Sequence, residues 1–341
     1  MQNFIERHLK KKSPLSMTLY PLSLIFTLIQ VFRRRLYKFR KVYRSNLKVI
    51  SVGNITAGGT GKTPFTIFLT QKLKAANIKV AVSHRGYKGN FENDNQLISG
   101  NNGLKSEAYD AGDEALLLAE KLIGIPVIAG KNRTKSLQIL TSEFPELEVV
   151  ILDDSFQHLK VKHDHDFVIF NQAGGIGNGF LLPAGILREP LSALKYADTI
   201  IYNGEGDIPQ YLNKYQTRVL QGHYLPSGLF INNETEIDIN QIKKAKLMLA
   251  SGIGNPASFE NTLHEMGLKW LEHIIYPDHY HYDQTVILKL NEQLKLNKPD
   301  YLLTTEKDYT KLRKAEIRCP IVVLRIKFQL DKDQDIIKLL F

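Results

Sequence analysis

Cysteine is almost absent from the sequence. Cys319 is the only one among 341 residues, which excludes a disulfide framework and a metal cage built from several thiolates. The histidines show no spacing typical of metal ligands, which argues against a zinc site. Low-complexity tracts and repeats of fixed period are also missing. These absences indicate an ordinary globular protein, and the scarcity of cysteine fits a reducing compartment.

The chain has room for two domains, since 341 residues with 43% hydrophobic residues can form a sizeable core. Its net charge is +10, and basic residues are concentrated near the N-terminus, at 10–12 and again at 33–44. Such clusters suit nucleic acid, an anionic membrane or a phosphorylated substrate. The segment between the two basic groups decides which partner is favoured.

Residues 14–32 form that segment, and they are largely apolar. Their length approaches a membrane span, although Pro21 and several polar side chains weaken it. A secretory signal does not fit, because the apolar stretch is too long and no small-x-small cleavage site precedes Arg33. A buried core helix is the alternative by length. The basic flanks favour membrane attachment, either spanning with the 33–44 side in the cytoplasm or lying flat in the interface.

The most informative stretch is residues 51–64, SVGNITAGGTGKTP. An apolar run precedes it and a segment with helical spacing follows it, which is the context of a phosphate-binding loop. We expect Lys62 to reach the β- and γ-phosphates and the Thr63 hydroxyl to bind Mg²⁺. The strict pattern has glycine where this chain has Thr56, so a purely structural glycine loop is the alternative. The residues expected to bind nucleotide are Gly53, Asn54, Thr56, Ala57, Gly58, Gly59, Thr60, Gly61, Lys62 and Thr63.

Short apolar runs alternate with helical segments along the rest of the chain. This alternation predicts an α/β fold: a P-loop NTPase-like, doubly wound, mostly parallel sheet with a second, smaller α/β subdomain and an N-terminal membrane-associated helix. Residues 88–108 are expected to form a loop or a small excursion. The pattern loosens near 207–242, so three parts are expected: the helix at 1–35, the P-loop domain at 36–220, and the C-terminal subdomain with linker strands at 221–341.

Two neighbouring acids, Asp153 and Asp154, end an expected buried strand. Ligands of parallel sheets bind at the carboxyl ends of strands, so these acids are candidate partners of Mg²⁺, with a turn or capping role as the alternative. Asp113 opens a helix and is a candidate base for a hydroxyl acceptor, although a first-turn acid also stabilises its own helix. Asp278 and His279 suggest an acid–histidine pair.

Three arginines stand beside glycines or at strand ends, where they could clamp phosphate. A solvated surface arginine is the alternative for each of them. They are Arg85, Arg133 and Arg188.

Several motifs occur together in one order and are specific as a set. They are GNITAGGTGKTP at 53–64, HRGY at 84–87, GDE at 112–114, DDSFQH at 153–158, LLPAGILREP at 181–190, SGIGNP at 251–256, PDH at 277–279 and TTEKD at 304–308. In these motifs the chain resembles the tetraacyldisaccharide 4′-kinases of lipid A biosynthesis, from about residue 14 to about residue 310. The loop of that family places its glycines as here, which accounts for Thr56.

The resemblance implies a membrane-associated enzyme at the cytoplasmic face of the inner membrane of Gram-negative bacteria. It would transfer the γ-phosphate of ATP, with Mg²⁺, to the 4′-hydroxyl of a tetraacylated glucosamine disaccharide 1-phosphate. The implied partners are this acylated substrate and the inner-membrane lipid surface, with no nucleic acid and no obligate protein partner. A two-stranded link between subdomains, as in the family, suits the stretch at 215–235 and the strand at 321–328.

Carried onto this sequence, the resemblance assigns Lys62 and Thr63 to phosphates and Mg²⁺, and Asp153 and Asp154 to metal binding and catalysis. Asp113, paired with His279, is implied to be the base that acts on the 4′-hydroxyl. Whether His279 accepts the proton or only orients Asp113 stays open. The positions implied near the substrate are Arg85, Tyr87, Gln157, Arg188 and Glu189.

The chain departs from the family pattern at His84, where serine is usual, at Ser155, where glycine is usual, and at Tyr280, often a histidine. None of these positions has a chemical task, but they surround residues that do. The competing function is a membrane-associated P-loop ATPase that couples hydrolysis to a protein or nucleic-acid partner. The apolar segment at 14–32 and the candidate base Asp113 argue against it. A nucleotide-binding membrane scaffold without catalysis is a third alternative, and the presence of Lys62, Asp113 and Asp154 argues against that.

Overall fold

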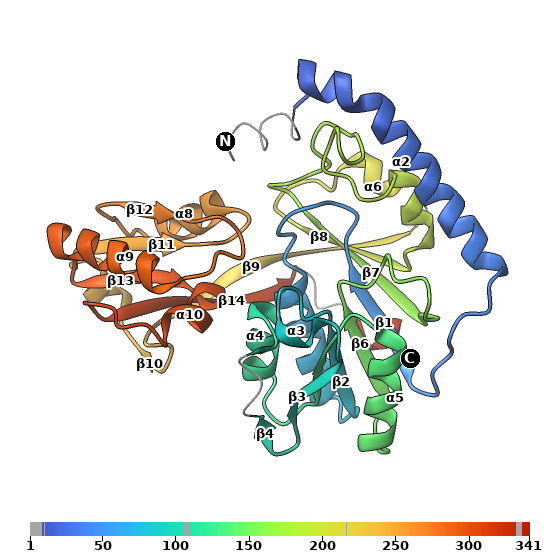
Figure 1. The fold of residues 1–341 in the computed structure, drawn as a ribbon, viewed down its shortest axis with the longest axis horizontal. Coiled ribbons are helices and arrows are strands. Elements are labelled where there is room, and N and C mark those ends of the chain that lie inside the picture. The colour runs from blue at the N-terminus through green and yellow to red at the C-terminus, as the bar shows by residue number, and fades with distance from the viewer. Residues whose placement is uncertain (1–8, 10, 106–109, 216, 332–335) are drawn as a thin grey trace. The chain divides into compact units, whose positions relative to one another are not determined.

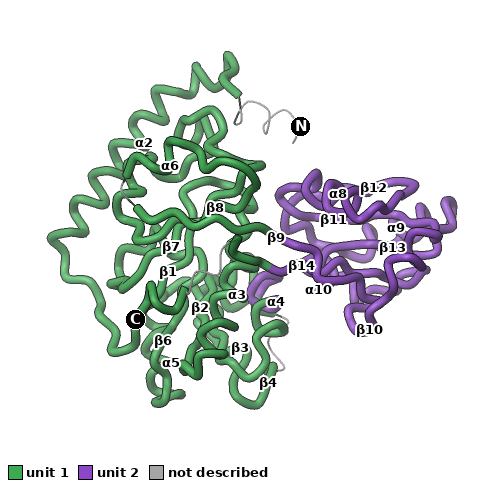
Figure 2. The backbone as a smooth tube through the Cα atoms, turned by 180° about the vertical axis from the view of Figure 1, so that it is seen from behind, with its two compact units in different colours: residues 1–111, 118–223, 328–341 green, residues 112–117, 224–327 purple. Residues whose placement is uncertain are grey.

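The computed structural model describes residues 9, 11–105, 110–215, 217–331 and 336–341. The chain divides into two compact units (Figure 2). Unit 1 comprises residues 1–111, 118–223 and 328–341, and unit 2 comprises residues 112–117 and 224–327. The expected boundary at 220/221 falls within a single strand, β9 (Arg218–Ile231). The expected three-part division stays a prediction, because contacts alone do not show which segments fold independently.

Unit 1 is built on a mostly parallel sheet (Figure 1). In spatial order its strands are the first part of β9, β8 (Thr199–Asn203), β7 (His165–Asn171), β1 (Lys48–Gly53), β6 (Val149–Asp153), β2 (Val80–His84), β5 (Val127–Ala129), β3 (Gln96–Gly100) and β4 (Gly103–Leu104). Its helices are α2 (Pro14–Phe39), α3 (Lys62–Ala75), the end of α4 (Asp113–Lys121), α5 (Arg133–Glu143) and α6 (Gln210–Asn213), with 3₁₀ turns η1 (Asn90–Glu92), η3 (Leu191–Tyr196) and η4 (Ile336–Leu339). The expected mostly parallel α/β fold is confirmed.

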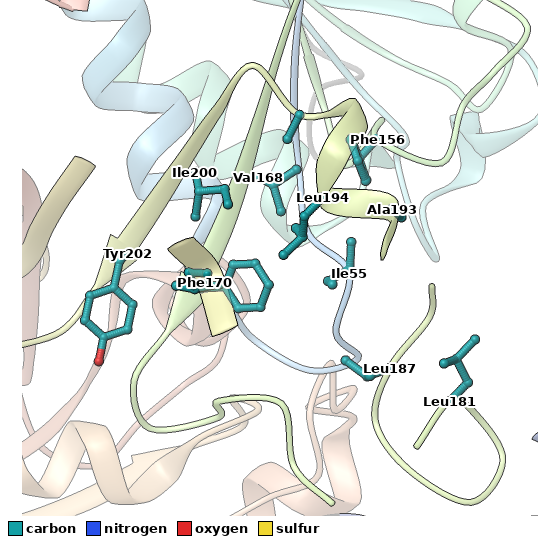
Figure 3. Packing of buried hydrophobic residues seen from close by; sticks show 12 residues of the cluster. Ile55, Phe156, Val168, Phe170, Leu181, Leu187, Ala193, Leu194, Ile200 and Tyr202 are labelled. Atoms are coloured by element: carbon teal, nitrogen blue, oxygen red, sulfur yellow. The ribbon is translucent and has the colours of Figure 1, made fainter. Parts of the chain in front are cut away.

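The central strands of unit 1 read as continuous apolar runs because both faces of the sheet are covered. β1 lies between β6 and β7, and each of its residues from Val49 to Gly53 is buried. One core cluster joins Ile55 of the glycine-rich loop to Phe156 and Leu187, together with side chains of β7 and β8 (Figure 3). The loop therefore rests on a packed core directly after its strand ends.

Helix α2 begins with a capping box in which Ser13 and Ser16 hydrogen-bond each other's backbone. Its buried residues are Ser16 and Ser23, whereas large apolar side chains are exposed. By length and composition this helix of 26 residues, which contains a window of 18 residues with mean hydropathy 1.7, could cross a membrane. It runs along the outside of unit 1 (Figure 1), where the Ser23 hydroxyl donates to the Leu181 carbonyl at 2.6 Å and accepts from the Ala184 amide at 3.0 Å. The helix thus places Ser16, Ser23 and the partly buried Phe26 against the protein, and it leaves many of its large apolar side chains exposed on the outer side.

Unit 2 is a smaller α/β layer whose strands pair in parallel in the order β12 (His273–Ile275), β11 (Leu247–Ser251), β13 (Tyr301–Thr305) and β14 (Ile321–Leu330). The other elements are β10 (Thr235–Glu236), α7 (Ile239–Ile242), α8 (Pro256–Glu265), α9 (Gln284–Asn297), α10 (Glu306–Leu312) and the first turn of α4. Two clusters of buried aliphatic side chains lie in this unit, and they contain Leu249, Leu263 and Leu303 in one and Met248, Leu290 and Val323 in the other.

The β3–β4 hairpin and β7 differ from the expectations, whereas β9 agrees with the implied two-stranded link. Residues 96–104, expected as part of a loop or excursion, form the antiparallel hairpin β3–β4, which extends the sheet beside β5. β7 was not expected, although it lies between β1 and β8. The loosened stretch contains the 14-residue strand β9, which neighbours β14. Each of the strands β9 and β14 has residues in both units, as a two-stranded link requires.

Gly53 provides a test of loop packing, because a Cβ at this position would lie 2.5 Å from the Cβ of Phe156 and 2.8 Å from its backbone nitrogen. We expect Gly53→Ala to lower the free energy of unfolding by about 1–3 kcal/mol through overpacking, measured by denaturant unfolding. The control is Gly59→Ala in the same loop, where nothing lies within 4 Å of the added Cβ. Its effect should stay within about 0.5 kcal/mol. Equal losses in the two variants would contradict the packing argument.

Candidate active site

The glycine-rich loop joins β1 to α3. Gly58 and Gly61 have positive φ angles of 100° and 80°, which glycine adopts without the steric penalty of a Cβ. Gly61 is the N-cap of α3 and provides no side-chain cap, so Lys62 and Thr63 stand in the first turn of a helix whose N-terminal end favours anions. This is the geometry of an anion-binding helix start.

Side chains and backbone of neighbouring segments hold the loop in shape. The buried Asn54 amide donates to the Thr60 hydroxyl at 2.7 Å, and the Gln157 amide donates to the Asn54 carbonyl at 2.7 Å. The Ala57 amide donates to the Ile186 carbonyl, and the Arg188 amide to the Ile55 carbonyl, both at 2.7 Å. Main-chain pairing with residues 186–188 therefore fixes a loop that has few side chains of its own.

Asp154 lies at the centre of the charged groups of this site. Its carboxylate Oδ1 is 3.3 Å from Lys62 Nζ and 3.3 Å from Arg188 Nη1. Burial raises the pKa of Asp154, but the positive charges of Lys62 and Arg188 lower it to about 2. Its φ of 51° is unusual for a residue other than glycine. The strand end therefore presents an ionised carboxylate beside the loop lysine.

Asp153 is buried, and its Oδ1 accepts the Asp154 amide at 2.9 Å. Behind it lies Arg133, which is only 2% exposed, so the surface alternative for this arginine is wrong. Its guanidinium donates to the Asp153 carbonyl, to the Ser83 hydroxyl at 3.1 Å and to the Gly130 carbonyl at 3.3 Å. Burial lowers the pKa of Arg133 to about 10, which still leaves it charged near neutral pH. The arginine ties the ends of β2, β5 and β6 together.

Two arginines of α2 reach the same end of the sheet. Arg33 donates to the Gln157 carbonyl at 2.6 Å, and Arg34 donates to Glu189 at 2.5 Å and to the Phe156 carbonyl at 3.2 Å. From the sequence, both arginines are expected to belong to a basic cluster that faces a membrane, a nucleic acid or a phosphorylated substrate. The Arg34 side chain is only 11% exposed, so it contacts the protein instead. Burial raises the pKa of Glu189 despite the opposing charge of Arg34.

The pair formed by Asp113 and His279 lies in unit 2, and Asp278 is farther from the ring, with its Oδ2 3.9 Å from His279 Nε2. His279 Nδ1 is 3.5 Å from Asp113 Oδ2, and Lys311 Nζ is 2.6 Å from the same oxygen. Lys307 Nζ lies 3.2 Å from His279 Nε2, 3.2 Å from Glu114 and 3.0 Å from Asp278. The structure thus brings Asp113 and His279 together, with two lysines that sequence reasoning missed.

The groups around Asp113 determine its protonation state. Burial raises the pKa of the Asp113 carboxyl, but hydrogen bonds from His279 and Lys311 and the charges of Lys311 and Lys307 together lower it below its usual value. Burial lowers the pKa of Lys307, and the nearby Glu114 and Asp278 more than offset this, so its pKa is raised. Near neutral pH the carboxylate is ionised and can accept a proton or a hydrogen bond.

The remaining expected positions separate into two groups. Gln157 and Arg188 contact the loop directly, and Glu189 is turned toward Arg34. Arg85 pairs with Glu92 at 2.8 Å, and its guanidinium lies over the Tyr87 ring at 5.5 Å. Lys307 belongs to the TTEKD motif, which marks it as a candidate site residue. No local pattern in the sequence shows that Lys307 or Lys311 contacts the acids at the start of α4.

A mostly parallel α/β sheet with a glycine-rich loop, a Lys-Thr pair opening a helix and an acidic strand end defines a P-loop nucleotide-binding protein. Among the described residues no group of three or more His, Cys, Asp and Glu side chains could hold a metal ion by itself. The chain belongs to the tetraacyldisaccharide-1-P 4′-kinase family, whose model matches residues 15–340.

Individual relatives agree with this assignment. The tetraacyldisaccharide 4′-kinase of Pelobacter propionicus is 35% identical over 329 residues, covering 95% of this chain and 90% of the relative. That of Haemophilus influenzae is 34% identical over 302 residues, covering 88% and 84%. A crystal structure of LpxK from Aquifex aeolicus, described as in complex with ATP, superposes with a TM-score of 0.76 at 29% identity, covering 95% of this chain and 98% of that one.

Arg133 gives a test of how this end of the sheet is held. We expect Arg133→Met to lower the free energy of unfolding by about 3 kcal/mol, because buried oxygens of Ser83, Gly130 and Asp153 lose their donor. Chemical denaturation measures the change. Arg85→Met is the control, since the Arg85 side chain is 49% exposed in its ion pair with Glu92 and such pairs contribute about 0–1 kcal/mol. A loss for Arg133→Met no larger than this control would contradict the assignment.

Proposed function

We propose that this protein is a lipid kinase that transfers the γ-phosphate of ATP to the 4′-hydroxyl of a tetraacyldisaccharide 1-phosphate, the reaction after which its relatives are named. One observation carries the proposal: a chain that matches the family over residues 15–340 has a glycine-rich loop at the start of a helix and an Asp113 carboxylate beside His279. A P-loop ATPase also needs a residue that positions its attacking water, so the family match over residues 15–340 is what favours a hydroxyl acceptor over water.

ATP fits the loop through its phosphates. The α3 N-terminus, the backbone at Gly58 and Gly59, and the Lys62 ammonium together favour a polyphosphate. A Cβ at Gly58 or Gly59 would meet nothing within 4 Å, so space is open where phosphate oxygens approach. Asn54 and Thr56 are buried, which suits a role in shaping the loop. Lys62 stabilises charge that develops on the transferring phosphoryl group.

Mg²⁺ fits the oxygen donors beside the loop. This ion is usually held by one or two carboxylates together with substrate phosphates and waters, so a cage of three acidic side chains is unnecessary. Asp154, whose pKa of about 2 keeps it ionised, Asp153 and the Thr63 hydroxyl are the residues that would hold it. When bound, the ion neutralises phosphate charge.

Asp113 is the base of the proposed reaction, and His279 is its orienting partner. A lysine ammonium can only donate, so the contact of Lys307 with His279 Nε2 makes that nitrogen an acceptor and leaves the ring proton on Nδ1, facing Asp113. In this tautomer the histidine holds the carboxylate in place, and the carboxylate accepts the hydroxyl proton. The proposed substrate contacts are Arg85, Tyr87, Gln157, Arg188 and Glu189.

We infer that α2 lies in the membrane interface at the cytoplasmic face of a bacterial inner membrane. Hydrogen bonds from Ser23 and Arg34 hold the helix against unit 1 along one side, which suits a helix lying flat better than one spanning the bilayer alone. Its outer side exposes apolar residues into which lipid chains can pack: Leu15, Met17, Leu22, Leu24, Ile25, Leu28, Ile29, Phe32, Leu36 and Phe39. The acyl chains of the substrate lie in the same layer.

The activity is tested with radiolabelled ATP, Mg²⁺ and a tetraacyldisaccharide 1-phosphate in detergent micelles. We expect phosphate at the 4′-position, and no stimulation of ATP hydrolysis by nucleic acid. Asp113→Asn should lower kcat roughly 10²–10⁴-fold through loss of the base, and Lys62→Ala at least about 100-fold through lost stabilisation of phosphate charge. If either variant keeps most of its activity, its assigned role is wrong.

The membrane proposal is tested by changing only the outer side of α2. Leu28 and Phe32 are 70% and 62% exposed, so Leu28→Glu with Phe32→Glu should abolish co-sedimentation with phosphatidylethanolamine–phosphatidylglycerol vesicles by adding charge to the buried layer. The matched control is Leu288→Glu with Leu296→Glu, on α9, where both leucines are also exposed. Unchanged sedimentation of the α2 variant would refute the interfacial placement.

A further inference from the structure

The helix α10 presents two lysines one turn apart to the pair formed by Asp113 and His279. Lys307 meets His279 Nε2, whereas Lys311 meets Asp113 Oδ2. The Lys311–Asp113 distance of 2.6 Å is shorter than the His279–Asp113 distance of 3.5 Å. The Asp113 carboxylate is therefore in closer contact with Lys311 than with His279.

Lys311 is itself fixed in place. Its ammonium also donates to the Tyr280 carbonyl at 2.9 Å, it lies 5.9 Å from the centre of the Tyr282 ring, and its side chain is 14% exposed. The first turn of α10 is anchored by the fully buried Asp308, which accepts from the Gly252 amide at 3.0 Å and from the Tyr282 hydroxyl at 3.1 Å. A lysine held at several points on an anchored helix can fix the orientation of its partner.

The two partners of Asp113 leave one of its oxygens available. In the part of the chain that the structure describes, the hydrogen bonds and ion pairs to this carboxylate come from His279 and Lys311, and both go to Oδ2. Oδ1 is then the oxygen that can accept a hydrogen bond from an incoming hydroxyl. A carboxylate clamped at one oxygen cannot rotate its free oxygen away from the acceptor, which is the geometric requirement for general-base catalysis.

We propose that Lys311 is a positioning residue for Asp113: it holds Oδ2, directs Oδ1 to the acceptor hydroxyl and keeps the carboxylate ionised. This role rests on the proposed kinase function. The lowered pKa of Asp113 supports it, since burial alone would raise that pKa and Lys311 is among the groups that oppose burial. Among the described residues, the charged and titratable groups that act on the carboxylate are His279 and Tyr282, with Lys311 and Lys307 on α10. Glu114 and Asp278 lie on the far side of the His279 ring, 3.8 and 3.9 Å from Nε2.

The sign of the pH effect follows from these groups. The base must be ionised, so activity falls as the pH falls through the pKa of Asp113, which is lowered in the folded protein. Loss of the Lys311 charge raises that pKa, and the acid limb of the pH profile moves to higher pH. A purely structural lysine would change kcat at all pH values without moving the limb.

The test compares wild type, Lys311→Met, Lys311→Arg and the control Lys289→Met, an exposed lysine on α9. In Lys311→Met we expect kcat to fall roughly 10- to 100-fold, the acid limb to move to higher pH, and ATP affinity to stay unchanged. Lys311→Arg should restore the limb, because a guanidinium also donates to Oδ2, and Lys289→Met should match wild type. Thermal unfolding shows whether each variant is folded.

A second measurement does not depend on activity. In protein labelled with ¹³C-aspartate, the carboxyl signal lost in Asp113→Asn is followed with pH, and its midpoint should rise in Lys311→Met. If wild type transfers phosphate but neither the limb nor this midpoint moves, the role of Lys311 is overturned and the proposed function stands. If wild type transfers no phosphate to the disaccharide, the proposed function and this role fall together.

Discussion

The organisation of unit 1 depends on main-chain pairing between the glycine-rich loop and residues 186–188. A loop of this composition cannot hold its own shape, because glycines contribute no side-chain contacts and have the largest conformational freedom to lose. Hydrogen bonds at Ala57 and Arg188 supply the missing constraint. The same pairing carries Arg188 to Asp154. One backbone contact thus determines both the shape of the loop and the charge beside it.

Unit 2 brings the acidic residues Asp113, Glu114 and Asp278 close together. Like charges at short range repel one another unless positive charge lies beside them. Lys307 and Lys311, spaced four residues apart on α10, lie on the same face of the helix and contact these acids in turn. A single short helix therefore supplies positive charge to all three acids, and this charge helps to lower the pKa of Asp113.

The sequence predicts local features well and distant ones poorly. The loop, Lys62, Thr63 and the acidic strand end follow from spacing within a few residues, and the alternating strands and helices give the α/β class. The strand β7 is not predicted from the sequence, because its apolar residues Phe167–Phe170 follow a polar run of histidines and aspartates. The pairing of Lys311 with Asp113 could not be predicted, since no local pattern relates residues so far apart. The sequence places Arg34 in a basic cluster suited to a membrane, a nucleic acid or a phosphorylated substrate, because no local pattern shows that Glu189 faces it.

The two sides of helix α2 place different constraints on the sequence. On the outer side, the proposed contact with lipid requires only apolar side chains, so Leu28 or Phe32 can be exchanged for other apolar residues. On the inside, Ser23 and Arg34 make directed hydrogen bonds to the segment that leads into residues 186–188 and to Glu189, and their identity is fixed by geometry. A foreign apolar helix grafted in its place would supply hydrophobicity but not these contacts. Helix α2 thus combines the apolar side proposed to enter the lipid with polar contacts to the segment that leads into residues 186–188.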